Sequence, residues 1–222
     1  MTFFDRTEAG RALATAVRAV VRADEDLVVL ALPRGGVPVA AEIARALRAP
    51  LDTMIVRKIG LPGRPEYAMG ALAEGRPPIL DEVTIRRAGV RAECLTEAIR
   101  RAETELARAV RTFRAGRVAP ELTGRVVLIV DDGVATGATV RVAVDCARAR
   151  GARRVGIAVP VAPRSVLRQL AALADDVLCV DASDDFVAVS QAYAHFEQLS
   201  DRQVVAVLES IPTRSPGRTQ AG

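Results

Sequence analysis

The most constraining feature of this chain is an uninterrupted apolar run, VVLIV at 126–130, followed directly by two acidic residues and a loop of small residues. A run without a polar face predicts a strand buried on both sides, as in a parallel sheet covered by helices. Four similar runs alternate with five helical patterns. The runs lie at 27–32, 53–56, 155–159 and 177–180, and the helical patterns at 8–22, 38–48, 82–114, 138–150 and 164–174. We therefore expect an α/β fold with a doubly wound, mainly parallel five-stranded sheet flanked by helices.

The length of 222 residues suits a single domain, which we place at residues 1–211. Residues 212–222 have little apolar content to bury and are predicted to be a disordered tail. The segment 60–78 holds four glycines and four prolines and shows little periodicity. We interpret residues 57–79 as a flexible lid loop, because long loops in compact domains are often functional.

Several classes of protein are disfavoured by the composition. No apolar run approaches the roughly 18 residues of a membrane span, and the N-terminus lacks the pattern of a secretory signal, so we expect a cytoplasmic protein. The three cysteines are far apart and favour neither a disulfide framework nor a zinc site. The net charge of +4 decides little, because arginine is abundant throughout the chain.

The acidic pair Asp131 and Asp132 is predicted at the carboxyl end of a strand, the edge of an open α/β sheet where ligands bind. The loop that follows, GVATGAT at 133–139, leads into a helix whose free N–H groups suit a phosphate. Neither an ATPase P-loop nor a dinucleotide fingerprint matches this spacing. The structural alternative is that the two acids only end the strand and cap a turn.

Residues 127–139, VLIVDDGVATGAT, resemble the signature of type I phosphoribosyltransferases that binds 5-phosphoribosyl 1-pyrophosphate (PRPP). The similarity extends over residues 27–160 and is greatest to bacterial proteins of unassigned substrate. The resemblance implies that Asp131 and Asp132 hold the ribose hydroxyls. It places the 5-phosphate against the loop from Ala135 to Thr139. The residues of this segment that are implied to bind PRPP are Gly133, Ala135, Thr136, Gly137, Ala138 and Thr139.

A second glycine-containing loop, LPRGGVP at 32–38, also lies between a predicted strand and a predicted helix. Gly35 and Gly36 allow an anion to approach the backbone, and Arg34 adds positive charge. The segment resembles the pyrophosphate loop of the family, particularly that of the xanthine-guanine branch, where a cis non-proline peptide is usual. The structural alternative is an ordinary Gly-Gly turn.

Lys58 is the only lysine among the 31 basic residues of the chain. With Arg57 it resembles the basic pair at the root of the lid in the orotate branch of the family, which implies a catalytic role for both residues. A lysine in a chain that otherwise uses arginine suggests that a compact ammonium group is needed there. Chance is the alternative explanation.

The chemistry that the resemblance implies is displacement of pyrophosphate from PRPP by a small nitrogenous acceptor, with Asp131 and Asp132 stabilising positive charge on the sugar. Mg²⁺ would be bound by the substrate, without direct protein ligands. The acceptor would lie under a hood at about 181–200, where Phe186 and Tyr193 are candidate stacking surfaces. Aromatic residues of this kind more often belong to the core. A homodimer is also implied.

A PRPP-sensing regulator that binds RNA or DNA is the alternative function. The pattern at 82–114 contains eight arginines, but glutamates lie among them, and Glu97 and Arg101 have helical i,i+4 spacing. We therefore expect a solvated, ion-paired helix and no specific nucleic-acid partner. The basic pair in the lid favours the enzyme, because a sensor needs no chemistry.

Overall fold

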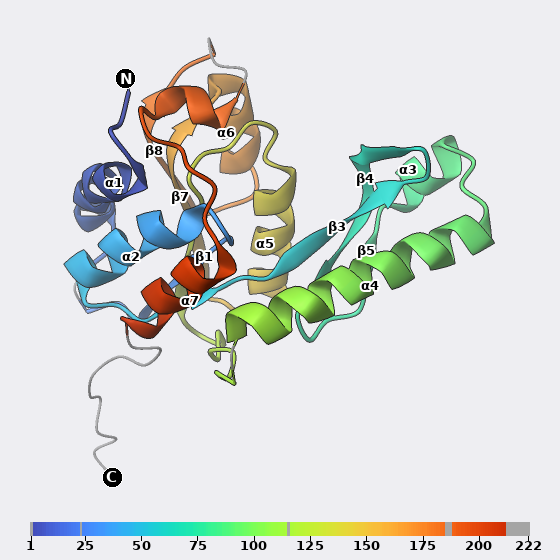
Figure 1. The fold of residues 1–222 in the computed structure, drawn as a ribbon, viewed down its shortest axis with the longest axis horizontal. Helices are drawn as coiled ribbons and strands as arrows, with labels where there is room; N and C mark the ends of the chain where they lie inside the picture. The colour runs from blue at the N-terminus through green and yellow to red at the C-terminus, as the bar shows by residue number, and fades with distance from the viewer. Residues whose placement is uncertain (1, 23, 115, 185–187, 212–222) are drawn as a thin grey trace.

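The computed structural model describes residues 2–22, 24–114, 116–184 and 188–211, so Phe186 and the predicted tail lie outside the described residues. Five strands form a sheet in the order β2-β1-β6-β7-β8, and all their pairings are parallel (Figure 1). This confirms the predicted fold class. The bounds are β1 Leu27–Ala31, β2 Leu51–Thr53, β6 Val126–Val130, β7 Arg154–Ala162 and β8 Asp176–Ala182.

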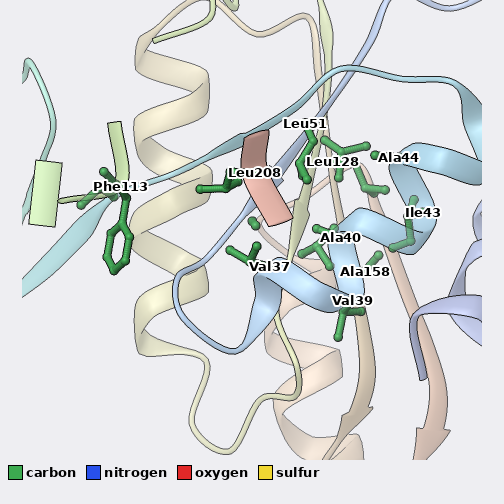
Figure 2. Close-up of a cluster of buried hydrophobic side chains, with 14 of the residues drawn as sticks. Val37, Val39, Ala40, Ile43, Ala44, Leu51, Phe113, Leu128, Ala158 and Leu208 are labelled. Carbon is green, nitrogen blue, oxygen red and sulfur yellow. The ribbon is translucent and has the colours of Figure 1, made fainter. Parts of the chain in front are cut away.

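Helices cover both faces of this sheet. Each strand sends alternate side chains to opposite faces, so Val29 packs with one set of helices and Val28 with the other. Figure 2 shows side chains of the first core, to which α2 and α7 contribute Ile43 and Leu208. The first face carries α1 (Arg6–Val20), α2 (Gly36–Leu47), α4 (Ala92–Arg114) and α7 (Asp201–Glu209), and the second carries α5 (Ala138–Ala149) and α6 (Arg164–Ala171).

The helices of the described part of the chain were also considered as membrane spans. None of them combines the length and the apolar character that a transmembrane helix requires.

The prediction of a long loop at 60–78 is wrong. The segment folds as an antiparallel sheet of β3 (Val56–Leu61), β4 (Arg64–Ala73) and β5 (Ile79–Leu80), which extends with α4 away from the main sheet (Figure 1). Pro62 and Gly63 form the turn between β3 and β4, and Gly63 has the positive φ of 75° that such a turn needs. The many small residues of β4 concealed its alternating pattern.

Two other predicted elements are each divided in the structure. The predicted strand at 53–56 is divided between the end of β2 and the start of β3. The predicted helix at 82–114 is interrupted, because Gly89 has a φ of 60° and separates α3 (Glu82–Arg87) from α4. Helix α7 and the short 3-10 helix η1 (Val189–Ala192) were not predicted.

The buried residues of α4 correct the prediction of a solvated, ion-paired helix, and the last of them, Arg114, is charged. Arg114 is 5% exposed and binds Glu74, the residue after β4, through Nε at 2.8 Å, and it also contacts Asp52 of β2. It donates a further hydrogen bond to the carbonyl of Thr53. The exposed part of α4 is ion-paired as predicted, since Arg101 lies 2.8 Å from Glu97. Arg114 thus fastens the antiparallel sheet and α4 to the main sheet.

Candidate functional site

The two predicted loops lie side by side at the carboxyl edge of the sheet. The strand order places β2 on one side of β1 and β6 on the other, so the connections leave in opposite directions at the β1-β6 boundary. Ala31 pairs with Val130, and the N–H of Leu32 donates to the carbonyl of Val130 at 2.8 Å. In open α/β sheets this switch point is the usual place for a ligand.

Asp131 and Asp132 follow β6 at this point. Burial raises the pKa of Asp131 well above its usual value, and the neighbouring charge of Asp132 adds to the effect. Burial also raises the pKa of Asp132, although the hydrogen bond and the charge of Arg6 oppose the shift. Two carboxylates held together in this way favour a ligand that brings hydroxyl donors or a cation to them.

The loop after the acids leads directly into α5. Ala135 and Thr136 are exposed, and Gly137 is the N-cap, with a φ of 76° that favours glycine and without a side-chain capping hydrogen bond. The first N–H groups of a helix lack partners within it and can therefore bind a phosphate. Since no side chain caps α5 at Gly137, neither acid serves as the N-terminal cap of this helix.

The loop after β1 contacts the acids closely. Its Pro33–Arg34 peptide is cis, as the family resemblance implies. Arg34 forms an ion pair with Asp201 at 2.9 Å and donates to the carbonyl of Leu199 at 3.1 Å. A Cβ atom on Gly35 would lie 2.0 Å from Oδ2 of Asp132, so glycine is needed here for the carboxylate to occupy its position.

This contact predicts the effect of Gly35→Ala. The backbone of Gly35 has a helical φ of −61°, which alanine adopts readily, but the added methyl group must displace the Asp132 carboxylate. We expect a folded protein that has lost at least tenfold in PRPP affinity, measured by isothermal titration calorimetry. Gly36→Ala is the contrasting variant, because its methyl group would meet backbone atoms of Val130 and Asp131. It should destabilise the fold by about 1–3 kcal/mol. Unchanged PRPP affinity in Gly35→Ala would contradict the predicted role of the Asp132 carboxylate in PRPP binding.

The two predicted basic residues of the lid share one pocket, but only Arg57 also reaches another. Arg57 of β3 lines a pocket of about 440 Å³ together with Arg34 and with Arg108 of α4. Arg57 and Lys58 both line a second pocket, of about 780 Å³, between β3 and α4. The structure therefore brings Arg57 to the loop after β1 but leaves Lys58 on the extended antiparallel sheet.

Tyr193 of the hood, a candidate stacking surface for the acceptor, is buried in the structure. Tyr193 is 6% exposed, and its hydroxyl donates to the backbone carbonyl of Asp132 at 2.5 Å. Its ring packs against Phe3 and Phe196, with centroids 5.8 Å and 5.1 Å away. Burial also raises the pKa of the Tyr193 phenol. Tyr193 therefore holds the backbone of the acidic pair through its hydroxyl, and its ring belongs to the core.

Sequence reasoning missed Arg6, the first residue of α1. Its Nε lies 2.8 Å from Oδ2 of Asp132, and its guanidinium lies 3.9 Å from the centroid of the Phe196 ring. One more arginine near the N-terminus gives no local signal in this arginine-rich sequence. Only the folded chain brings it to Asp132, which is 126 residues away in sequence.

A dedicated metal cage is not formed by the described residues, which contain no group of three or more His, Cys, Asp or Glu side chains able to hold an ion. The two carboxylates alone fit a hard cation such as Mg²⁺ only if other oxygen ligands come from the substrate or from water.

Comparison with known proteins identifies the family. The model of the phosphoribosyl transferase domain matches residues 5–197. The chain is 45% identical over 207 residues to the Mycobacterium tuberculosis H37Rv protein named "Putative phosphoribosyl transferase Rv0571c". The alignment covers 93% of this chain and 46% of the relative, so the chain spans about half the length of that protein.

Solved structures share the fold of this chain. The protein TT1426 from Thermus thermophilus is 39% identical, with a TM-score of 0.85 over 96% of this chain and 100% of that one. A hypoxanthine-guanine phosphoribosyltransferase from Bacillus anthracis is 12% identical, with a TM-score of 0.50 over 88% of this chain and 93% of that one, which shows a shared fold alone. The match over most of its length establishes that this chain belongs to the phosphoribosyl transferase domain family.

Proposed function

We propose that this chain binds PRPP across the ends of β1 and β6 and transfers its 5-phosphoribosyl group to a small nitrogenous acceptor. The observation that supports this proposal most directly is the contact between the two loops, in which Gly35 leaves room for the carboxylate of Asp132. An anion-binding loop on each side of two carboxylates suits a ligand with a phosphate at one end, hydroxyls in the middle and a pyrophosphate at the other.

Each part of PRPP has a proposed place. The 5-phosphate would bind the N–H groups of the loop from Gly133 to Thr139, and the ribose hydroxyls would donate to Asp131 and Asp132. The pyrophosphate would contact the backbone of Gly35 and Gly36 and the side chains of Arg34 and Arg57. During transfer the bond from C1 to the pyrophosphate oxygen breaks, and a bond from C1 to the acceptor nitrogen forms. The acceptor then loses a proton, and pyrophosphate leaves with the bonding electron pair.

The carboxylates have a second proposed role in this reaction. Positive charge develops on the ribose as the pyrophosphate departs, and fixed negative charge beside the sugar stabilises it. Mg²⁺ bound by the substrate would neutralise the pyrophosphate oxygens and assist their departure. We further expect a cytoplasmic homodimer.

Lys58 is assigned a role in turnover. It lies on the antiparallel sheet away from the acids and next to Arg57, and a cation beside the proposed pyrophosphate position would act mostly on charge that develops as the pyrophosphate leaves. Lys58→Ala should therefore lower kcat more than it lowers PRPP affinity. Unchanged turnover would remove Lys58 from the catalytic residues.

The proposal is tested by a screen of nucleobases and other small amines with PRPP and Mg²⁺, with release of pyrophosphate as the signal. We expect the wild-type protein to release pyrophosphate from PRPP with at least one acceptor. The turnover of Lys58→Ala is then compared with that of the wild type on that acceptor. Saturable PRPP binding without turnover of any acceptor, together with tight sequence-specific retention of RNA or DNA at physiological salt, would favour the regulator instead.

A further inference from the structure

Arg6 is held in place by contacts that do not depend on a ligand. Asp5 caps α1 by accepting a hydrogen bond from the N–H of Glu8 at 2.8 Å, which fixes the start of the helix. The preceding residues pair with the hood, since Phe3 donates from its N–H to the carbonyl of Ala192 at 2.8 Å and accepts one from Ala194 at the same distance. The N-terminus of α1 is therefore fastened beside Asp132.

The Arg6 guanidinium is nearly enclosed. Its side chain is 11% exposed and that of Asp132 is 13% exposed. Nη1 donates to the carbonyl of Glu197 at 2.9 Å, and the aromatic ring of Phe196 lies over the guanidinium. An arginine that stacks on a ring while it binds a carboxylate has little freedom to leave. The hydrogen bond from Arg6 therefore goes to one carboxylate oxygen, Oδ2, and directs it toward α1.

We propose that Arg6 is a positioning residue in PRPP binding. Arg6 holds the Asp132 carboxylate so that the second carboxylate oxygen, Oδ1, accepts a hydrogen bond from a ribose hydroxyl. This inference rests on the proposed binding of PRPP at the acidic pair. Arg6 also supplies a positive charge that reduces repulsion between two adjacent carboxylates and a ligand rich in phosphate.

The charge of Arg6 also affects the ionisation of the acidic pair. Asp132 faces Asp131 beside it in the chain, Arg6 on α1 and the phenol of Tyr193 in the hood, so Arg6 is the cation among these groups. Without Arg6, the protonated form of the acidic pair is favoured up to a higher pH. A protonated carboxyl group accepts more weakly than a carboxylate, so PRPP affinity should then begin to fall at a higher pH than in the wild type.

The experiment compares the dissociation constant for PRPP with Mg²⁺ by calorimetry, between pH 5 and pH 8, in wild type, Arg6→Gln and Arg6→Lys. We expect Arg6→Gln to bind on the order of tenfold to a hundredfold more weakly, as for loss of a hydrogen bond to a charged group. The pH below which PRPP affinity falls should be higher in Arg6→Gln than in the wild type. Arg6→Lys should recover part of the affinity and the pH dependence of the wild type, because the charge is kept while the planar fork is lost.

Arg11→Gln is the matched control. Arg11 lies on the same helix and pairs with Glu42 at 3.2 Å, but its side chain is 72% exposed. This variant should bind PRPP as the wild type does. A uniform loss of affinity at every pH in Arg6→Gln, with no recovery in Arg6→Lys, would indicate a packing role and overturn the inference. Equal or tighter binding by Arg6→Gln would overturn it too, whereas failure of the wild type to bind PRPP would reject the proposed function itself.

Discussion

Asp131→Asn combined with Asp132→Asn is expected to abolish most of the rise in melting temperature that PRPP with Mg²⁺ gives the wild-type protein. A ligand that binds only the folded state stabilises it by RT ln(1 + [L]/Kd), about 2.7 kcal/mol at a hundredfold excess over Kd. For a chain of this size each kcal/mol corresponds to about 2–4 °C. Neutral amides accept more weakly from the ribose hydroxyls and provide no charge toward the metal-bound sugar, so the shift should disappear.

The double variant should nevertheless fold. The folded-state pKa values of both acids are raised, so the stability that the pair contributes is present at low pH and is lost as the pH rises through those values. Ionisation of the pair therefore destabilises the folded state. Asparagine removes it and gives up the ion pair with Arg6, so we expect a melting temperature without ligand within a few degrees of the wild type.

Differential scanning fluorimetry of the two proteins, with and without PRPP and Mg²⁺, separates the possible roles of the acids. Ribose 5-phosphate and pyrophosphate, each added alone, serve as control ligands for the two ends of the site. A variant that keeps its own melting temperature but loses the ligand shift identifies a binding site. A variant that melts far below the wild type without ligand would show that the acids are structural. No shift in the wild type at millimolar PRPP would contradict the proposal of PRPP binding.

Arg114→Met is expected to destabilise the protein by about 3–5 kcal/mol, because it leaves Asp52 and Glu74 without their cation in a largely buried place. The melting temperature should fall on the order of 10 °C. The effect should be large because the Asp52 side chain is only 3% exposed. Methionine fills a similar volume, so the loss reports mainly on the unpaired charges.

Chemical denaturation followed by circular dichroism measures this loss. Arg100→Met is the control on the same helix, because Arg100 pairs with Glu97 on an exposed surface, where ion pairs contribute little. It should leave the unfolding midpoint nearly unchanged. Adding Asp52→Asn to Arg114→Met should recover part of the lost stability, since one unpaired charge is removed. An Arg114→Met midpoint equal to that of the wild type would rule out a stabilising role for this network.

The main sheet and the two loops of the site could be predicted from the sequence because their signals are local. The run at 126–130 is uniformly apolar, and it forms β6 with the predicted bounds. Glycines and acidic residues next to such runs are within a few residues of the strand ends, and parallel pairing then brings those ends to one edge of the sheet. The contact of Gly35 with Asp132 is the direct result.

The antiparallel sheet was missed for a different reason. Strand β4 contains Ala68, Gly70, Ala71 and Ala73, which give a weak alternation of apolar and polar residues. Its formation depends on pairing with β3 and on packing against α4, whose side chains lie some 30 residues further along the chain. A segment with weak intrinsic preference takes its structure from such tertiary contacts.

The sequence by itself determined the α/β class, the order of most strands and helices, and the position of the acidic pair between two glycine-containing loops. Only the tertiary structure decided which side chains surround that pair. Arg6 and Tyr193 reach Asp132 from 126 and 61 residues away, and Arg114 is buried although the other arginines of its helix are exposed. The physical reason is that charge pairing and burial depend on which distant elements pack together, and the pattern of neighbouring residues carries no record of those contacts.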